Sequence, residues 1–263
     1  MKSSLKTIPI EETNEKEFFN FLNKDKILHI FTIYDLKNMR DKTRVWLALK
    51  DKEICGYLFE FDKRIVHTHG TIESLTKLLS CIDLDDPVMV IEPHHLVVVK
   101  EFFEPVEPTD SSSKSKITMY FVMQANAENF KPLIKHRVKE LGTDDLDDVL
   151  KHLGEEWKNR VENAIRRGLA FGAYERNVLA SIATVPEIID NIALIRGVYT
   201  VPSLRGTGLA TSASSALVKE LISLGKEVVL WVAKDNLPAR KVYEKMSFKK
   251  TKHFLLGFKA KRL

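Results

Sequence analysis

The feature that most constrains how this chain folds is a glycine-containing stretch at residues 198–211, Val-Tyr-Thr-Val-Pro-Ser-Leu-Arg-Gly-Thr-Gly-Leu-Ala-Thr. An apolar strand pattern leads into the glycines, and an amphipathic helix pattern follows from Leu209. Gly206 and Gly208 tolerate backbone dihedrals that other residues avoid, so a row of backbone N–H groups can stay open toward a ligand. A strand, loop and helix in this order predict an anion-binding cradle at a helix N-terminus.

Length and charge narrow the class of protein. At 263 residues, with 44% apolar and 29% charged residues, the chain has room for two domains of ordinary size. Its apolar runs are far too short for a membrane span, and Glu11, Glu12 and Glu15 stand where a signal peptide has its apolar core. We therefore expect a cytoplasmic protein with no membrane partner. The net charge of +5 is modest and the basic residues are spread along the chain, which argues against a nucleic-acid partner.

The cysteines and histidines show no metal-ligand spacing. Cys55 and Cys81 lie inside apolar patterns, which favours buried thiols over a disulfide or a metal site. The close histidine pairs are His67-Thr68-His69 and His94-His95, for which we expect turn or surface positions. The sequence therefore predicts no metal.

Hydrophobic periodicity predicts strands alternating with helices, and hence an α/β fold with a mixed sheet. An opening helix is expected in the first 30 residues, and the polar stretch 124–131 is the expected domain boundary. Strands are expected at 44–49, 54–61, 88–91, 117–123, 136–141, 169–174, 178–185, 192–201, 228–232 and 254–259. Helices are expected at 71–80 and 143–153, with Thr71 and Thr143 as N-caps, and at 96–103, 155–167, 209–224 and 238–246.

The two halves of the chain repeat one pattern. Residues 45–58 match the apolar rhythm of residues 169–182 at a constant offset, and both patterns predict hairpins. Residues 88–102 run parallel to residues 229–243, which sets His95 against Asn236 and Phe102 against Tyr243. The chain is therefore interpreted as two copies of one α/β unit, 1–127 and 128–263. The first copy has no arginine and paired glycines before its helix, so we do not expect it to bind the same anion.

Two short motifs carry a resemblance to a known family. Arg205-Gly206-Thr207-Gly208-Leu209-Ala210 is followed, 31 residues after Arg205, by the segment from Asn236 to Tyr243. Both resemble the signatures of the GNAT superfamily of acyl-coenzyme A dependent N-acyltransferases. The motif Val198-Tyr199-Thr200-x-Pro202 and the tandem layout most resemble the branch of this superfamily that includes glycine N-acyltransferases. The resemblance covers about residues 134–250, and Ser247 stands where family members usually have glycine. A Rossmann site would need a third glycine and a P-loop would need a lysine, and neither is present.

The resemblance implies a tandem GNAT-like fold in which the first copy is degenerate and the second binds acetyl-CoA as cosubstrate. Backbone N–H groups would hold the pyrophosphate, assisted by the helix dipole, at Gly206, Thr207, Gly208, Leu209, Ala210 and Thr211. Arg205 would belong to the same cofactor-binding loop, mainly through its backbone. Val198, Tyr199 and Thr200 would pair with the pantetheine arm, and Asn236 would contact the same arm. A backbone N–H near this strand would polarise the thioester carbonyl. Tyr243 would act as the general acid that protonates the departing thiolate.

The residues themselves leave alternatives open. Asn236 could cap the helix that begins near Pro238, Tyr243 could be a core residue, and Arg205 could serve the fold of the loop. The places where family members put a general base hold Ile192 and Trp231. Glu175 and Glu187 are expected in turns as solvated side chains, so a water relay or a partly neutral amine would replace a dedicated base.

The resemblance thus implies direct acetyl transfer from acetyl-CoA to a primary amine, on a small molecule or on a protein N-terminus or lysine. The first half would wall the acceptor site or support assembly, which leaves a homodimer open. One alternative is a module that binds acyl-CoA without turning it over. Another is an aminoacyl transferase acting with charged tRNA, which would need basic surface concentrated on one face.

Overall fold

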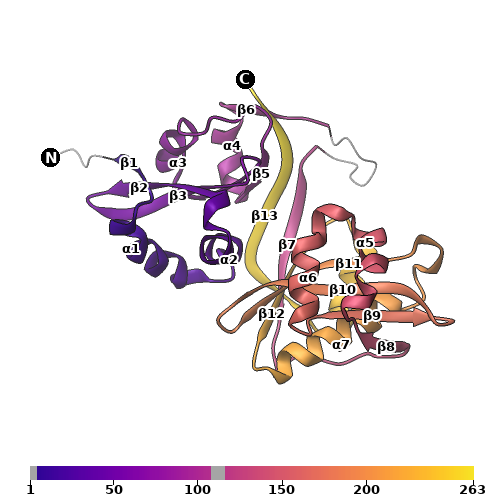
Figure 1. Ribbon diagram of the computed structural model, residues 1–263. Helices are drawn as coiled ribbons and strands as arrows, with labels where there is room; N and C mark the ends of the chain where they lie inside the picture. The colour runs from indigo at the N-terminus through magenta and orange to yellow at the C-terminus, as the bar shows by residue number, and fades with distance from the viewer. Residues whose placement is uncertain (1–4, 108–115) are drawn as a thin grey trace. The chain divides into compact units, whose positions relative to one another are not determined.

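The computed structural model describes residues 5–107 and 116–263 (Figure 1). It divides into two compact units: unit 1 comprises residues 1–120 with 253–263, and unit 2 comprises residues 121–252. None of the helices in the described ranges is long and apolar enough to cross a membrane. The fold is the expected α/β fold with mixed sheets.

Unit 1 is a mixed sheet covered by helices on both faces. Its elements are, in chain order, β1 (Lys6–Pro9), α1 (Glu12–Leu22), α2 (Ile30–Asn38), β2 (Thr43–Lys50), β3 (Glu53–Phe61), β4 (Ile65–Gly70), α3 (Ile72–Leu79), β5 (Val88–Ile91), α4 (Leu96–Val99), β6 (Phe103–Pro105) and most of β13 (Lys249–Arg262). The strand order is β1-β2-β3-β4-β5-β13, and of these pairs only β4 with β5 is parallel. Figure 1 shows α1 and α2 on one face of this sheet and α3 and α4 on the other.

Unit 2 has the same layered construction. Its elements are most of β7 (Thr118–Ala125), β8 (Arg137–Glu140), α5 (Leu146–Leu153), α6 (Lys158–Arg166), β9 (Ala170–Glu175), β10 (Val178–Ile189), β11 (Ile192–Thr200), α7 (Leu209–Ser223), β12 (Glu227–Ala233) and α8 (Leu237–Lys245). The strand order is β8-β9-β10-β11-β12-β7, with β11 and β12 parallel. One apolar core lies between the sheet and α7 with α8, and a second between the sheet and α5 with α6.

The two units share one order of elements. Each has a strand, two helices, a three-stranded antiparallel meander, a helix, a strand parallel to the last strand of the meander, and a final helix. The hairpins predicted from the sequence repeat are β2–β3 and β9–β10. The predicted tandem architecture is confirmed.

Two strands, β7 and β13, belong to different units than the continuous ranges 1–127 and 128–263 would give. β13 pairs with β5, and its side chains Leu256, Phe258 and Ala260 join the core of unit 1. β7 neighbours β12, and its side chains Phe121 and Met123 join the core of unit 2. Each sheet therefore includes a strand that comes, in the sequence, after the last helix of the other copy: β13 after α8, and β7 after α4 and β6. Alternating apolar residues predict a strand but not its partner, because both sheets offer an apolar face.

Several helix boundaries differ from the expectation. The opening helix is split into α1 and α2. The helix expected over 96–103 ends at Val99 and is followed by β6. Thr71 caps α3 as predicted, accepting a hydrogen bond from the Ser74 amide at 3.2 Å. Thr143 does not cap: it begins a 3₁₀ turn, and the Asp145 carboxylate accepts from the Gly142 amide at 2.8 Å instead.

The positions of the histidine pairs are also a correction. His67 and His69 lie within strand β4, not in a turn, and His95 is fully buried. Strand β4 lies beside the turn that follows β5. His95, which belongs to that turn, contacts the Thr68 hydroxyl and the Gly70 carbonyl of β4. The thiols of Cys55 and Cys81 are free, as expected, but half-buried.

Candidate functional site

The candidate site of unit 2 begins where two parallel strands separate. β11 pairs with β12 from Ile192 opposite Glu227 as far as Ile195 opposite Leu230. β11 continues to Thr200 and β12 to Ala233, but the pairing does not. The side of residues 196–200 that would face β12 therefore offers a strand edge. An extended ligand can add to such an edge through backbone hydrogen bonds.

A bulge at Gly197 marks the point of divergence. The register between β10 and β11 shifts between the pairs Ile182–Tyr199 and Thr184–Arg196, and Gly197 has φ +62°. A Cβ at Gly197 would lie 2.8 Å from the hydroxyl of Thr184, which donates to the Arg196 carbonyl at 2.8 Å. Glycine is required there because of both the dihedral and the close approach. The sequence signal that marks this position is a glycine inside a strand pattern.

The predicted cradle lies directly after this strand. A 3₁₀ turn at Pro202–Leu204 leads to Gly206 with φ +83° and Gly208 with φ +96°, and α7 begins at Leu209. The first amides of a helix have no acceptor within the helix, so those of Leu209, Ala210 and Thr211 are available to an anion. Apart from its two neighbours in the chain, no described residue has an atom within 4 Å of where a Cβ of Gly206 would be. The loop therefore has an open side next to these amides.

A second segment supports the loop. The imidazole Nε2 of His136 lies 3.0 Å from the carbonyl oxygen of Thr207. The backbone before β8 is held along α7 by two buried hydroxyls: Ser212 accepts from the His136 amide at 3.3 Å, and Ser215 accepts from the Leu133 amide at 2.7 Å. Sequence reasoning missed this support. Its signal is the group of serines, Ser212, Ser214 and Ser215, among the apolar buried residues of α7.

The end of β11 and Arg205 are tied together. The Arg205 Nε donates to the Thr200 carbonyl at 3.2 Å, and its guanidinium lies over the Tyr199 ring at 5.9 Å. The Tyr199 carbonyl accepts from the Ser181 hydroxyl at 2.7 Å, and its ring stacks on His152 at 5.1 Å. These contacts favour the alternative in which the Arg205 side chain holds the loop against the strand.

The second motif lies on α8, which follows β12 on the other side of the divergence. Asn236 is exposed and caps α8, accepting from the Ala239 amide at 3.1 Å. Tyr243 is 7% exposed in the apolar core, with its ring centroid 5.7 Å from that of Phe248. Burial raises the pKa of the Tyr243 phenol well above its usual value, so the group carries its proton at neutral pH. Ser247, where the family usually has glycine, has φ +66°, in the left-handed region that glycine favours.

Glu187 is not a solvated turn residue. It lies in β10, which extends to Ile189, and its side chain is fully buried. Its carboxylate pairs with the guanidinium groups of Arg160 and, at 3.0 Å, Arg196. The missed signal is Arg196 inside an apolar strand, since a charge at such a position needs a buried partner. Glu175 also differs from the expectation: it is the last residue of strand β9, beside the hairpin turn, and it is half-buried.

In unit 1 the parallel strands β4 and β5 also separate, but a side chain fills the space between them. β4 and β5 pair only as far as His67 opposite Val90. Beyond that point His95 bridges the gap, with Nε2 2.9 Å from the Gly70 carbonyl oxygen and Nδ1 2.9 Å from the Thr68 hydroxyl. Thr71 alone separates β4 from α3, so no loop corresponds to residues 201–208. Within residues 5–107 and 116–263, unit 2 alone combines an open strand edge with a glycine loop before the following helix.

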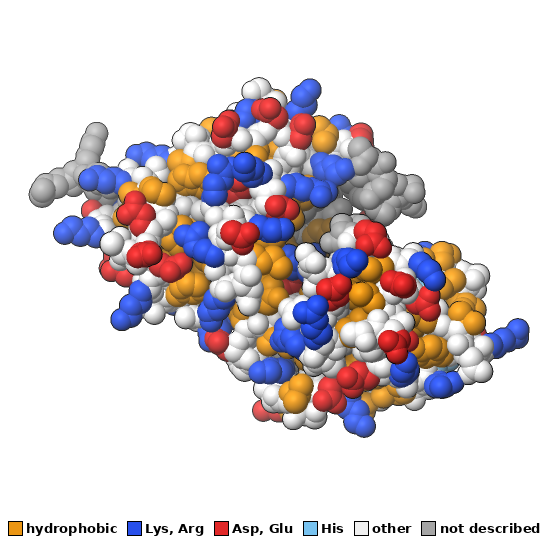
Figure 2. Space-filling view, viewed as in Figure 1, with side chains coloured by type: hydrophobic (Ala, Val, Ile, Leu, Met, Phe, Trp, Pro, Cys, Tyr) orange, Lys and Arg blue, Asp and Glu red, His pale blue; other side chains and the backbone are white. Residues whose placement is uncertain are grey.

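The surface view shows mixed charge. On the face drawn in Figure 2, basic and acidic side chains are interspersed over both units, without a region of a single sign. That face does not provide the concentrated basic surface expected for tRNA binding.

Comparison with known proteins identifies the fold. Residues 170–255, which include the divergence, the cradle and α8, match the model of the FR47-like protein family. Over the whole chain the structure is that of the tandem GNAT fold. No curated protein matches the sequence.

Three solved structures illustrate the likeness. An acetyltransferase of the GNAT family from Colwellia psychrerythraea aligns with a TM-score of 0.64 and 16% identity, covering 98% of this chain and 100% of that one. A GCN5-related N-acetyltransferase from Sphaerobacter thermophilus aligns with a TM-score of 0.68 and 11% identity, covering 98% and 95%. A tandem GNAT protein from the clavulanic acid biosynthesis pathway aligns with a TM-score of 0.61 and 12% identity, covering 98% of both chains.

Proposed function

We propose that unit 2 binds acetyl-CoA and transfers its acetyl group directly to a primary amine. The observation that carries this proposal is the divergence of β11 from β12 immediately before the glycine loop of α7. A strand edge beside a set of open helix amides fits a ligand that is extended at one end and anionic at the other. Pantetheine and pyrophosphate have these properties in that order. The free thiols of Cys55 and Cys81 suit a reducing compartment, and we propose a cytoplasmic location.

In this proposal the groups of unit 2 act on a single transfer step. The neutral amine attacks the thioester carbonyl, a C–N bond forms, and the C–S bond breaks. A backbone N–H at the edge of residues 198–200 donates to the oxygen on which negative charge develops. Tyr243 gives its proton to the departing thiolate. Val198, Tyr199, Thr200 and Asn236 position the pantetheine arm, and the amides from Gly206 to Thr211 hold the pyrophosphate.

The structure offers no role as general base to Glu187. Its carboxylate is fully buried and paired with the guanidinium groups of Arg160 and Arg196, so it is not free to approach a bound amine. The excess proton of the amine leaves to water, or the amine binds already neutral. The rate should therefore rise with pH until the amine is fully deprotonated.

The test is acceptor-dependent thiol release from acetyl-CoA across a panel of primary amines, with two glycine variants. Gly206→Ala and Gly225→Ala both place a side chain at positive φ, +83° and +71°, and in both cases the added Cβ meets no atom within 4 Å. Their backbone strain is therefore matched. Gly225 follows the other end of α7. We expect Gly206→Ala to weaken acetyl-CoA binding at least tenfold and Gly225→Ala to leave it within twofold. Equal effects of the two variants would contradict the cradle.

A second candidate function is binding of acyl-CoA without turnover. It is favoured by the engagement of Glu187 in ion pairs, which leaves the site without an assigned base. Calorimetry distinguishes the two functions: tight acetyl-CoA binding with no thiol release on any amine would support the binding module.

A further inference from the structure

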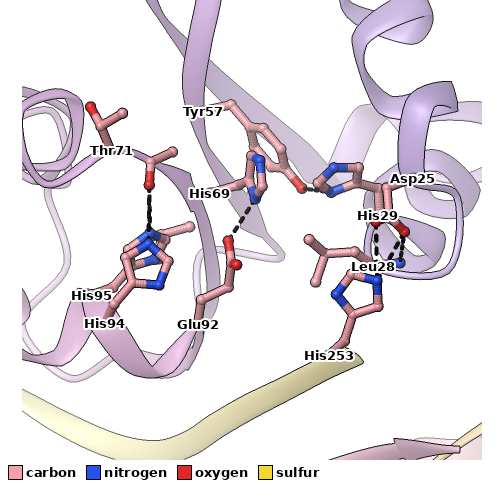
Figure 3. A network of polar contacts seen from close by, with 12 residues as sticks. Asp25, Leu28, His29, Tyr57, His69, Thr71, Glu92, His94, His95 and His253 are labelled. Atoms are coloured by element: carbon pink, nitrogen blue, oxygen red, sulfur yellow. Dashed lines mark hydrogen bonds and ion pairs between the residues drawn. The ribbon is translucent and has the colours of Figure 1, made fainter. Parts of the chain in front are cut away.

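A cluster of imidazole and carboxylate groups lies in unit 1 around the turn that follows β5 (Figure 3). The turn has the sequence Glu92-Pro93-His94-His95, and its last three residues form a 3₁₀ helix. One donor atom from each of Glu92, His94 and His95 lies within 4.8 Å of the others. The site proposed for acetyl-CoA uses none of these residues.

The two histidines direct nitrogen atoms at one point. The Nε2 atom of His94 lies 3.3 Å from the carbonyl oxygen of Gly70, and that of His95 lies 2.9 Å from the same oxygen. Their ring centroids are 4.2 Å apart, with the planes at 62°. A pair of neighbouring imidazoles in this arrangement can share one central ion.

Further polar groups orient the donor atoms. The Nδ1 atom of His69 lies 2.6 Å from the Glu92 carboxylate, and Figure 3 shows the two side chains pointing at one another. The hydroxyl of Thr68 lies 2.9 Å from the other ring nitrogen of His95. Metal-binding histidines and carboxylates characteristically have hydrogen-bond partners of this kind, which fix their orientation and tautomer.

We propose that Glu92, His94 and His95 bind a divalent transition-metal ion, with Zn²⁺ the best match to two imidazoles and one carboxylate. Three protein ligands leave a fourth tetrahedral position for water. Mg²⁺ and Ca²⁺ prefer oxygen ligands and fit this donor set poorly. This differs from the sequence expectation of no metal, because the sequence does not show that β4 brings its own polar groups to the turn after β5.

Binding requires small movements. Zinc bonds of about 2.0–2.1 Å place tetrahedral donors about 3.4 Å apart, so the three atoms must close together. His94 is exposed and can move toward His95 without disturbing the core. His95 would exchange its hydrogen bond with the Gly70 carbonyl for the metal, and its Nδ1–H would then donate to the Thr68 hydroxyl. The hydrogen bonds of the two imidazoles to the Gly70 carbonyl oxygen contribute far less than an ordinary zinc site gains.

The test is titration of the full-length chain with Zn²⁺ by calorimetry after treatment with a chelator. We expect one Zn²⁺ per chain with a Kd in the micromolar range or tighter, and no binding of Mg²⁺. Co²⁺ in place of Zn²⁺ should give the visible absorption bands of a tetrahedral site. Neither readout depends on acetyl transfer, so the result is independent of the proposed function.

Variants locate the site. His94→Ala changes an exposed side chain and should weaken Zn²⁺ binding at least tenfold, while the melting temperature of the metal-free protein stays within about 2 °C. Glu92→Gln should weaken binding similarly. His152→Ala in unit 2 is the histidine control and should bind as the wild type does. Absence of Zn²⁺ binding by the wild type, or unchanged binding by both His94→Ala and Glu92→Gln, would overturn the proposal. The cluster would then serve only to bridge the separated strands.

Discussion

Unit 1 and unit 2 have the same order of strands and helices, and they differ most at one junction. In unit 2, residues 201–208 separate the last strand of the meander from the following helix, whereas Thr71 alone does so in unit 1. In unit 1, α3 also lies very close to the sheet: a Cβ on Gly70 would lie 2.6 Å from the Ser74 hydroxyl of α3. The cofactor site that we propose in unit 2 therefore needs more than a sheet with diverging strands. The junction decides whether helix amides are open to a ligand.

The second difference concerns what stands in the divergence. The sequence repeat sets His95 of unit 1 against Asn236 of unit 2. His95 is fully buried and hydrogen-bonds across the gap to the Gly70 carbonyl of β4. Asn236 is exposed and caps the helix that follows it, α8. A long aromatic side chain fills the gap between the strands, whereas a short amide leaves it free. The same position thus closes one copy and keeps the other open.

The largest expected effect comes from Tyr243→Phe, which gives unit 2 the residue that unit 1 has at the matching position, Phe102. We expect kcat for acetyl transfer to fall about 100-fold with little change in the KM for acetyl-CoA, since a positioned general acid contributes at least this much. Because burial raises the phenol's pKa above its usual value, the wild type should show no loss of rate from tyrosine ionisation below about pH 10.

Tyr174→Phe serves as the control for Tyr243→Phe. Tyr174 is a half-buried tyrosine of unit 2 whose hydroxyl faces Asp145. Steady-state kinetics should show it unchanged within twofold. An unaltered kcat in Tyr243→Phe would assign Tyr243 to packing alone.

The second prediction compares the buried carboxylates of the two units. Glu187→Gln leaves two guanidinium groups, of Arg160 and Arg196, around a neutral amide, and we expect a loss of about 3 kcal/mol in the free energy of unfolding. Glu60→Gln in unit 1 leaves only Arg44, whose side chain is 46% exposed and can turn to water, so we expect about 1 kcal/mol. Urea unfolding measures both. A loss at Glu60 equal to that at Glu187 would contradict the ion-pair account.

Short-range features of this fold were predictable. Gly206, Gly208 and Gly225 all have positive φ where the sequence predicts a loop and a helix end. Thr71 caps α3, and the paired hairpins follow from alternation within a few residues. Such features depend on neighbours along the chain, and so the tandem fold and the glycine loop before α7 could be predicted from the sequence.

Long-range features were not predictable. Which sheet receives β13 depends on a partner strand, β5, that is remote in sequence. The burial of Glu187 depends on Arg160 from another element, and that of His95 on Thr68 and Gly70 from β4. An isolated charge or histidine in the sequence does not reveal whether a partner is present, so it was assigned to the surface.

The third prediction concerns pH and unit 1. In the described residues the buried histidines, His29 and His95, both belong to unit 1. Burial, with a contribution from His69, lowers the pKa of His29 to about 3. The unfolded chain binds this proton near pH 6.5, so stability is full above that pH and falls as the pH drops toward 3. At about 1.4 kcal/mol per pH unit, His29 costs about 2 kcal/mol at pH 5.

The variant for this prediction is His29→Asn, which keeps a polar group near the Tyr57 hydroxyl, 2.8 Å from Nδ1 in the wild type, but does not titrate. Urea unfolding at pH 7.5 and at pH 5 should show that the wild type loses about 2 kcal/mol more than the variant. Parallel losses in the two proteins would show that His29 does not carry the acid sensitivity.

The smallest expected effect separates the two roles of Asn236. Asn236→Ala removes the cap of α8 and should cost about 1 kcal/mol of stability, while Asn236→Ser keeps a capping oxygen and should cost much less. If Asn236 also contacts the pantetheine arm, both variants lose the amide, and we expect the KM for acetyl-CoA to rise about fivefold in each. Thr71→Ala removes a comparable helix cap in unit 1, away from the proposed acetyl-CoA site. It should lower stability without changing the KM for acetyl-CoA. A normal KM in Asn236→Ser would restrict Asn236 to capping, and the contrast with His95 would then rest on the size of the side chain alone.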